Sequence, residues 1–174
     1  MKTNTTKEKI LELLFMFPLR KFHLREISKI LKISTPSISN SVKQLEKEKM
    51  VNHINQTKPI YEIHANFSSQ KFKNMKRVHN LKSIYCSGFY DFLIENFPFS
   101  TIVLFGSYAK GDDTEKSDID IFIDAKEKRF DLGTYEKKLN KKINIEFADF
   151  NKISKELKNS IANGIVLSGY MLLK

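Results

Sequence analysis

The sequence predicts an α+β protein with a mostly helical front third and a sheet in its back half. Three observations support this. Apolar residues recur at helical spacing over the first fifty residues, two short β-like runs follow them, and "DIDIFID" and "INIEFA" alternate apolar and polar residues as strands do. We divide the chain into a first domain over residues 1–66, a linker helix over 67–97 and a second domain over 98–174.

The composition of the chain excludes several classes of protein. The chain has 174 residues, is 41% hydrophobic and 29% charged, and is therefore expected to be globular rather than disordered. Of the net charge of +10, residues 1–66 hold +6, which favours a polyanion partner there over a general lysine bias. The single cysteine, Cys86, excludes an internal disulfide and a thiolate metal cluster. No apolar run is long enough to span a membrane, so we expect no membrane contact and a cytoplasmic location.

Along the first domain the sequence predicts three helices followed by a hairpin. Residues 7–16 and "HLREISKIL" each place apolar side chains on one helical face. The third helix opens at "STPSISNSVKQLEKEK", where Ser34 or Thr35 can cap it and Pro36 suits its first turn. The strands "VNHI" and "IYEIH" follow, joined by a polar turn that contains Lys58.

This order resembles a winged helix-turn-helix domain over about residues 5–66, and "LREISKILKISTPSISNSVKQLEKEKMV" is similar to the core of many prokaryotic regulators. In that family the third helix enters the DNA major groove and the wing touches phosphates. The resemblance implies contacts to DNA from polar residues of the third helix and the wing: Thr35, Ser37, Ser39, Asn40, Lys43 and Lys58. A protein-binding winged helix is the alternative, and a homodimer is expected if the domain reads a palindrome.

Apolar residues at helical spacing over residues 67–97 predict one long helix, with a kink near Gly88. Its first half is basic. That half either contacts phosphates or forms a solvated charged face.

The second domain begins with "TIVLF" (101–105), an apolar run typical of a buried strand, which turns at Gly106 into a short helix. In "DIDIFID" the isoleucines face one way, and Asp118 and Asp120 face the other. In "INIEFA" Asn144 and Glu146 face away from the core. If the two strands are adjacent, Asp118, Asp120 and Glu146 share one surface.

Such a carboxylate group needs a cation. Two unit charges about 4 Å apart cost roughly 4 kcal/mol at an effective dielectric of about 20. Hard divalent cations prefer carboxylate oxygens, and Mg²⁺, or Mn²⁺ in its place, is usual where a phosphate completes the coordination. Gly106 allows a ligand to approach the backbone, and the Ser107 hydroxyl can bind an anion. Together these features indicate nucleotidyl transfer.

Gly106-Ser107, then ten residues, then Asp118-Ile119-Asp120 matches the signature of the DNA polymerase β-like nucleotidyltransferase superfamily. The stretch "GSYAKGDDTEKSDIDIFI" is most similar to the minimal nucleotidyltransferases of prokaryotes, over about residues 85–174. The resemblance implies an α/β domain with a mixed sheet. It assigns metal binding and catalysis to Asp118, Asp120 and Glu146, with Asp149 as the alternative third carboxylate, and phosphate binding to Gly106, Ser107 and Lys110. The remaining acids of the loop, Asp112, Asp113 and Glu115, are expected to be solvated.

For the whole chain the resemblance implies an adenylyltransferase that moves AMP from ATP to a protein or other acceptor. Little chain follows the predicted sheet, so the expected acceptor is a macromolecule. An antitoxin paired with a toxin-like partner fits a DNA-binding arm. The alternative is a transcription regulator or antitoxin whose second domain senses nucleotide or binds a partner without turnover.

Overall fold

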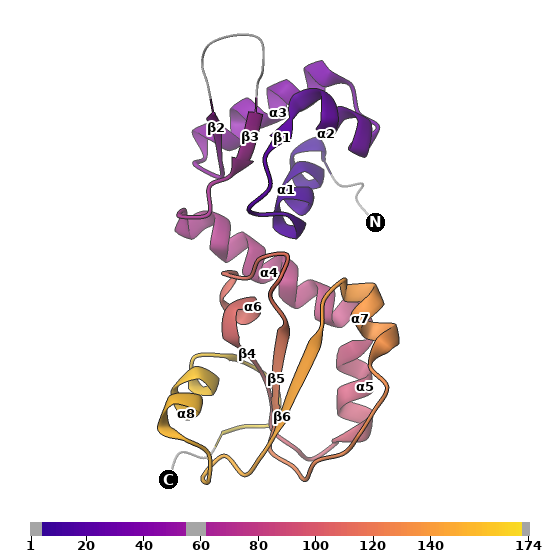
Figure 1. The fold of residues 1–174 in the computed structure, drawn as a ribbon, viewed down its shortest axis with the longest axis vertical. Helices are drawn as coiled ribbons and strands as arrows, with labels where there is room; N and C mark the ends of the chain where they lie inside the picture. Colours follow the sequence, from indigo (N-terminus) through magenta and orange to yellow (C-terminus); the bar gives the residue numbers. More distant parts are fainter. Residues whose placement is uncertain (1–4, 55–61, 172–174) are drawn as a thin grey trace. The chain divides into compact units, whose positions relative to one another are not determined.

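The computed structural model describes residues 5–54 and 62–171. The chain forms two compact units, Met1–Lys76 and Arg77–Lys174, and the boundary between them along the chain falls within the predicted linker (Figure 1). The helix α4 (Gln70–Cys86) begins in the first unit and ends in the second. Phe72 of this helix packs in the first core and Ile84 in the second, so the linker region belongs to both units rather than forming a separate spacer.

The first unit has the winged helix-turn-helix arrangement. Its elements are α1 (Thr6–Met16), β1 (Phe22–His23), α2 (Leu24–Leu31), α3 (Thr35–Lys47), β2 (Val51–Ile54) and β3 (Glu62–Ala65). The three strands form an antiparallel sheet in the order β1-β3-β2. The sequence pattern did not reveal β1, because two residues are too few to show an alternation.

Local chemistry fixes the ends of the helices in this unit. Thr5 caps α1 in a reciprocal pair with Glu8, and Lys32 ends α2 in the left-handed conformation. Ser34 occupies the N-cap position of α3, with a proline in the first turn as predicted. The predicted apolar stripe of α3 is buried and consists of Ile38, Val42 and Leu45. The inner side of α3 is therefore fixed by packing.

The predicted helix over residues 67–97 is interrupted at Gly88, where the sequence predicts a kink, and the interruption is a complete break. The structure has two helices, α4 and α5 (Phe89–Asn96), separated at Gly88. Gly88 has a φ of 79°, which a residue inside an α-helix cannot adopt. The break turns Phe89 and Leu93 of α5 into the core of the second unit, where both are fully buried.

The second unit contains a four-stranded mixed sheet, as predicted. Its remaining elements are β4 (Ile102–Phe105), α6 (Gly106–Lys110), β5 (Ile119–Ile123), α7 (Gly133–Leu139), β6 (Ile143–Phe147), α8 (Lys155–Ala162) and β7 (Ile165–Ser168). The strand order is β6-β5-β4-β7. β5 and β6 run parallel, whereas β4 is antiparallel to both of its neighbours.

The two faces of this sheet are covered by different helices. Ile119, Ile121 and Ile123 pack in the core that includes residues of α4, α5 and α7, and Figure 1 shows α5 and α7 on one side of the sheet and α8 on the other. Phe122 points to the opposite face and packs with Phe150 and with residues of α8. The predicted alternation of β5 is confirmed, so Asp120 lies on the α8 face.

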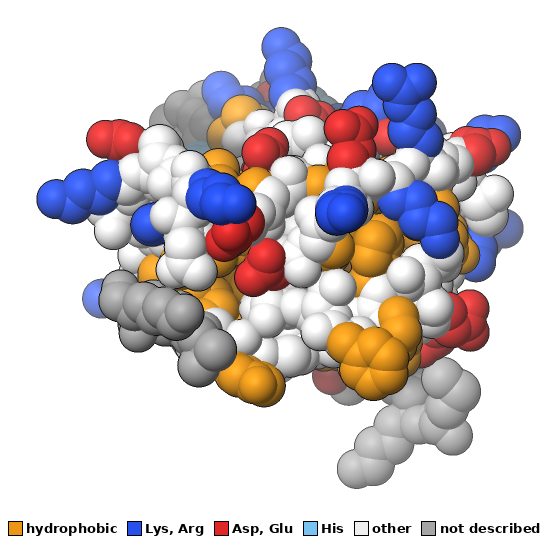
Figure 2. All heavy atoms as spheres, turned by 90° about the horizontal axis from the view of Figure 1, so that it is seen from below, with side chains coloured by type: hydrophobic (Ala, Val, Ile, Leu, Met, Phe, Trp, Pro, Cys, Tyr) orange, Lys and Arg blue, Asp and Glu red, His pale blue; other side chains and the backbone are white. Residues whose placement is uncertain are grey.

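The surface of the second unit mixes residue types. In the view of Figure 2 hydrophobic side chains are interspersed with basic and acidic ones. Its most exposed large hydrophobic residues are Phe99 and Tyr170. Among the residues that the structure describes, no helix is long and apolar enough to cross a membrane.

Candidate functional site

The centre of the site is a close approach between two strand ends. In the β4–β5 ladder Phe105 pairs with Asp120, and Gly106 follows directly with a φ of 72°. A Cβ atom at Gly106 would lie 2.3 Å from Oδ2 of Asp120, closer than any real contact. Glycine is therefore required here twice, for its conformation and for its lack of a side chain. The backbone at the start of α6, with Ser107 next in the chain, lies directly against a carboxylate.

Asp118 lies just before β5 and is exposed, whereas Asp120 is half-buried within the strand. The amide of Ile119 between them donates to the carbonyl of Lys142, at a distance of 2.8 Å. This bond joins the first residue of β5 to the residue just before β6. Asp118 stands two residues before Asp120, and the expectation that its side chain shares the face of Asp120 stays a prediction.

The register of β6 decides which residue lies next to Asp120. Asp120 pairs with Asn144, whose Nδ2 lies 3.4 Å from Oδ1 of Asp120. Glu146 pairs with Phe122, one alternation further along, and is exposed. From the strand spacing and rise, the Cα atoms of Asp120 and Glu146 are about 8 Å apart. The nearest β6 partner of Asp120 is thus an amide, which the sequence pattern did not single out.

The alternative third carboxylate, Asp149, is engaged elsewhere. It follows β6, accepts a hydrogen bond from the amide of Asn151 at 2.9 Å, and pairs with Lys152 at 3.4 Å. The Asn151 amide and, to a lesser extent, Lys152 hold the pKa of Asp149 below its usual value. Its carboxylate therefore stabilises a local turn.

Within the described part of the chain, no three His, Cys, Asp or Glu residues are grouped closely enough to hold a metal ion. The Asp120 carboxylate and the side-chain amide of Asn144 come together here, and the Asp118 carboxylate stands two residues before Asp120; carboxylates are hard ligands. Mg²⁺ is commonly held by one or two carboxylates, with water and substrate phosphates completing its shell. This donor set fits Mg²⁺ or Mn²⁺ bound together with a phosphate.

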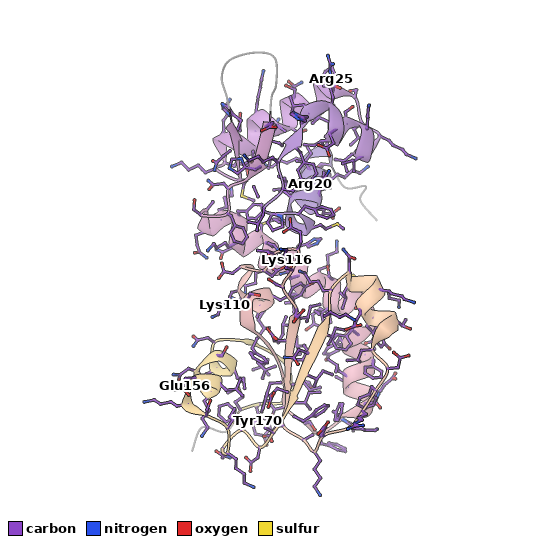
Figure 3. All side chains as sticks on the ribbon, in the orientation of Figure 1. Arg20, Arg25, Lys110, Lys116, Glu156 and Tyr170 are labelled. Atoms are coloured by element: carbon purple, nitrogen blue, oxygen red, sulfur yellow. The ribbon has the colours of Figure 1, made fainter. Side chains whose placement is uncertain are left out.

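A cleft of about 480 Å³ borders Asp118 and is lined by the loop that precedes β5 and by α7. Its lining includes neither Gly106 nor Asp120. Lys116 lies on this rim, and Lys110 extends from α6 (Figure 3). Lys110 is exposed, and its predicted contact with the triphosphate stays a prediction.

The expectation that Asp113 is solvated is wrong. Its side chain is completely buried and accepts a hydrogen bond from Nδ2 of Asn80 on α4, at 2.7 Å. The ammonium group of Lys141 lies 3.3 Å from its other oxygen, Oδ2. No sequence signal separates Asp113 from its exposed neighbour Glu115, because both stand in one short polar loop. The contacts come from α4 and from the residue two positions before β6.

The same buried region perturbs Tyr108 of α6. Burial, and then the nearby charge of Asp113, raise the pKa of the Tyr108 hydroxyl above its usual value, which keeps this side chain neutral. Asn80 also donates to the carbonyl oxygen of Tyr108, at 2.9 Å. The short helix that follows Gly106 is therefore anchored to α4.

In the first unit, the outer face of α3 presents only part of the predicted DNA-binding set. Asn40 and Lys43 are exposed, one turn apart. Gln44 and Lys47 are exposed beside them and were not predicted, although their helical spacing from Asn40 would have indicated it.

The other predicted contacts of this unit are placed differently. Ser37 turns toward α1, where its hydroxyl lies 3.4 Å from that of Thr6. Thr35 and Ser39 are half-buried. Lys58 lies outside the described residues.

Comparison with known proteins finds a family match within the second unit. Residues 90–170, just under half of the chain, match the family model "Polymerase beta, Nucleotidyltransferase". This region is therefore a nucleotidyltransferase-like domain. No curated protein matches the chain. A solved structure of the adhesin competence repressor AdcR from Streptococcus pyogenes is 20% identical, with a TM-score of 0.37 over 55% of this chain and 69% of that one. A similarity at that level supports no inference about function.

Proposed function

We propose that the second unit is a metal-dependent nucleotidyltransferase that moves a nucleoside monophosphate, AMP from ATP, to an acceptor hydroxyl. The observation that carries the proposal is the contact of the Gly106 backbone with the Asp120 carboxylate. It brings a phosphate-binding turn and a metal-binding carboxylate together inside a domain that matches the nucleotidyltransferase family. Each half alone is common, whereas their direct contact suits a nucleoside triphosphate and a divalent cation bound side by side.

The proposed reaction is a displacement at the α-phosphorus. The acceptor oxygen forms a bond to phosphorus, the bond to the pyrophosphate oxygen breaks, and pyrophosphate leaves with the electron pair. A carboxylate receives the proton of the acceptor hydroxyl, and we assign this role to Glu146, which is exposed on the same face as Asn144. A bound Mg²⁺ or Mn²⁺ neutralises charge on the phosphates.

The remaining residues bind and orient. Asp118 and Asp120 would hold the cation, and the amide nitrogen of Asn144 would orient the Asp120 carboxylate by donating to its Oδ1 atom. The Gly106 and Ser107 backbone and the Ser107 hydroxyl would hold the β- and γ-phosphates, and Lys110 would add a positive charge.

For the first unit we propose DNA binding. Asn40 and Lys43 on the outer face of α3 would contact bases and phosphates, together with Lys58 between the two wing strands. This arm would bring the enzyme to its own operator, as in an antitoxin that modifies a toxin-like partner and regulates the pair. A homodimer would match a palindromic site.

A second candidate is a regulator that binds nucleotide without transferring it. The side-by-side pairing of Asp120 with an amide, Asn144, rather than with a third carboxylate favours this candidate. It predicts DNA binding that responds to ATP and no covalent product.

One experiment separates the two. The full chain is incubated with Mg²⁺ or Mn²⁺ and ATP labelled on its α-phosphate, alone, with the protein encoded beside it, and with nucleic acid. We expect a labelled acceptor that disappears in Asp118→Asn and Asp120→Asn. Glu115→Gln, an exposed acid of the same loop, serves as the matched control and should retain transfer. Labelling that survives both aspartate substitutions contradicts the proposed site, and ATP-sensitive DNA binding without labelling supports the regulator.

A further inference from the structure

Lys141 lies outside the Gly106–Asp120 signature, and the proposed reaction gives it no role. It stands two residues before β6, and its side chain is 12% exposed. Its ammonium group donates to the carbonyl oxygens of Thr114 at 2.6 Å and Ser117 at 3.1 Å. Those two residues also bond to each other, through the Thr114 amide and the Ser117 hydroxyl at 2.9 Å. The mostly buried ammonium group of Lys141 therefore bridges two backbone carbonyls of the segment directly before Asp118.

The charge of Lys141 is balanced inside the same loop. Asp113 is fully buried with its Oδ2 atom 3.3 Å from the lysine nitrogen. Asn80 holds Oδ1 of Asp113 and, with the same amide group, the carbonyl of Tyr108 on α6. The Lys141 ammonium group also lies 5.8 Å from the centre of the Tyr108 ring. These contacts connect α6, the loop and the start of β6.

Each of the three connected segments leads to one part of the proposed site. α6 begins at Gly106, the loop ends at Asp118, and the chain after Lys141 enters β6 with Asn144 and Glu146. A loop of polar residues has no regular backbone hydrogen bonding of its own, so its position depends on such side-chain contacts.

We propose that Lys141, balanced by Asp113 and Asn80, is a positioning residue that fixes loop 111–118 and thereby sets the distance from Asp118 to the Gly106 backbone. The consequence for catalysis rests on the proposed function, whereas the positioning itself is a property of the folded chain. Lys141 touches neither of the proposed metal-binding carboxylates, so it acts through the loop backbone. The neighbouring Lys142 provides a matched comparison, since its side chain is 78% exposed and pairs only at the surface, with Glu136.

The test compares Lys141→Met with Lys142→Met in the full chain. Hydrogen exchange of the metal-free proteins is followed in peptides that cover 111–118 and, as internal references, β4 and β7. We expect faster exchange confined to the loop in Lys141→Met and a wild-type pattern in Lys142→Met. Mn²⁺ affinity is measured by electron paramagnetic resonance with α,β-methylene ATP present. Loss of a residue that orients metal ligands lowers metal affinity by about 10- to 100-fold, and we expect this only in Lys141→Met.

A double variant separates positioning from charge balance. Lys141→Met alone leaves Asp113 buried without its lysine, and Asp113→Asn/Lys141→Met removes both charges, so the double variant should regain stability. It does not restore a donor to the carbonyls of Thr114 and Ser117. We therefore expect its loop to exchange as fast as in Lys141→Met even where its melting temperature returns to that of the wild type.

Three outcomes overturn the proposal: loop exchange in Lys141→Met equal to that in Lys142→Met, exchange that accelerates uniformly through the unit, or a double variant with wild-type loop exchange. If Lys141→Met does not fold, the double variant alone decides. A wild-type chain that neither binds Mn²⁺ with the analogue nor transfers nucleotide contradicts the proposed function. In that case the exchange of the metal-free proteins still decides the role of Lys141.

Discussion

Asp113 in the second unit and Glu48 in the first are both acids that pair with lysine, and they differ in burial. The Asp113 side chain is 1% exposed and that of its partner Lys141 12%. The Glu48 side chain is 32% exposed, and its partners Lys7 and Lys71 are 32% and 55% exposed. Glu48 accepts a hydrogen bond from Lys71 at 2.9 Å and is in close contact with Lys7.

An ion pair between an acid and a lysine therefore contributes differently to stability in the two units. Around Glu48, water screens the charges and can replace any lost partner, so the pairs contribute little. The Asp113 carboxylate itself is almost inaccessible to water, and a buried charge left without its partner is strongly destabilising. The environment of a charged group, rather than its type or its number of partners, sets what its removal costs.

The largest effect should follow from Asp113→Ala. It leaves the ammonium group of Lys141 buried without its carboxylate, and we expect a loss of about 3–5 kcal/mol in the free energy of unfolding. Urea unfolding of the full chain measures this loss. Glu115→Ala, an exposed acid two residues away, is the control and should change stability by less than about 0.5 kcal/mol. Equal effects of the two substitutions would remove the distinction between buried and exposed acids.

Glycines extend the comparison to a different residue type. Gly106 and Gly88 have almost the same φ, 72° and 79°, but a Cβ atom would meet Asp120 at the first and nothing within 4 Å at the second. Gly88→Ala should cost only the backbone strain, roughly 1–2 kcal/mol. Gly106→Ala should cost roughly 2–4 kcal/mol and also displace the Asp120 carboxylate.

Two measurements check the glycine prediction. Thermal unfolding gives the order of the two stabilities, and titration with Mn²⁺ and α,β-methylene ATP gives binding. We expect weakened binding in Gly106→Ala alone. Equal loss of binding in both variants would show that backbone strain, not the contact with Asp120, is responsible.

A smaller effect is expected on the outer face of α3, where an exposed lysine can matter for binding without mattering for folding. Lys43→Ala should leave the free energy of unfolding unchanged and weaken DNA binding by about 10-fold, because one phosphate contact is lost. The slope of log affinity against log salt concentration should also become shallower by about 0.9. Fluorescence anisotropy at several salt concentrations measures the slope. Lys9→Ala, an exposed lysine of α1, serves as the control. A slope that is the same for wild type and Lys43→Ala contradicts the assignment of this face.

The smallest effect belongs to Glu48. Its hydrogen bonds with Lys7 and Lys71 hold its pKa below the ordinary value of 4.5. A lowered pKa in the folded state contributes stability above pH 4.5, and this contribution is lost as the pH falls through the lowered value.

Glu48→Gln should therefore cost about 0.2–1 kcal/mol at pH 7 and progressively less below pH 4.5. Urea unfolding of wild type and variant across this range provides the check. A difference that grows toward low pH has the wrong sign and would exclude the ion pairs as its cause.

Local patterns in the sequence predicted most of the helices and strands and the faces of the strands. Helical periodicity and strand alternation are local properties, so the inner stripe of α3 and the opposite orientations of Ile119 and Asp120 could be predicted from neighbouring residues alone. The distance along the chain between Gly106 and Asp118 is also in the sequence, and that spacing pointed to the chemistry of the second unit.

The contacts between segments that are distant in the chain could not be predicted from the sequence. The register of β6 against β5 placed Asn144 rather than Glu146 beside Asp120, because a shift of two residues keeps every side chain on its face and leaves the alternation unchanged. The contacts of Asp113 with Asn80 and Lys141 join residues 33 and 28 positions away in the chain, where local patterns hold no information. Register and burial arise from packing between distant segments, and for this reason the sequence indicated the candidate site while the fold determined the neighbours of each of its residues.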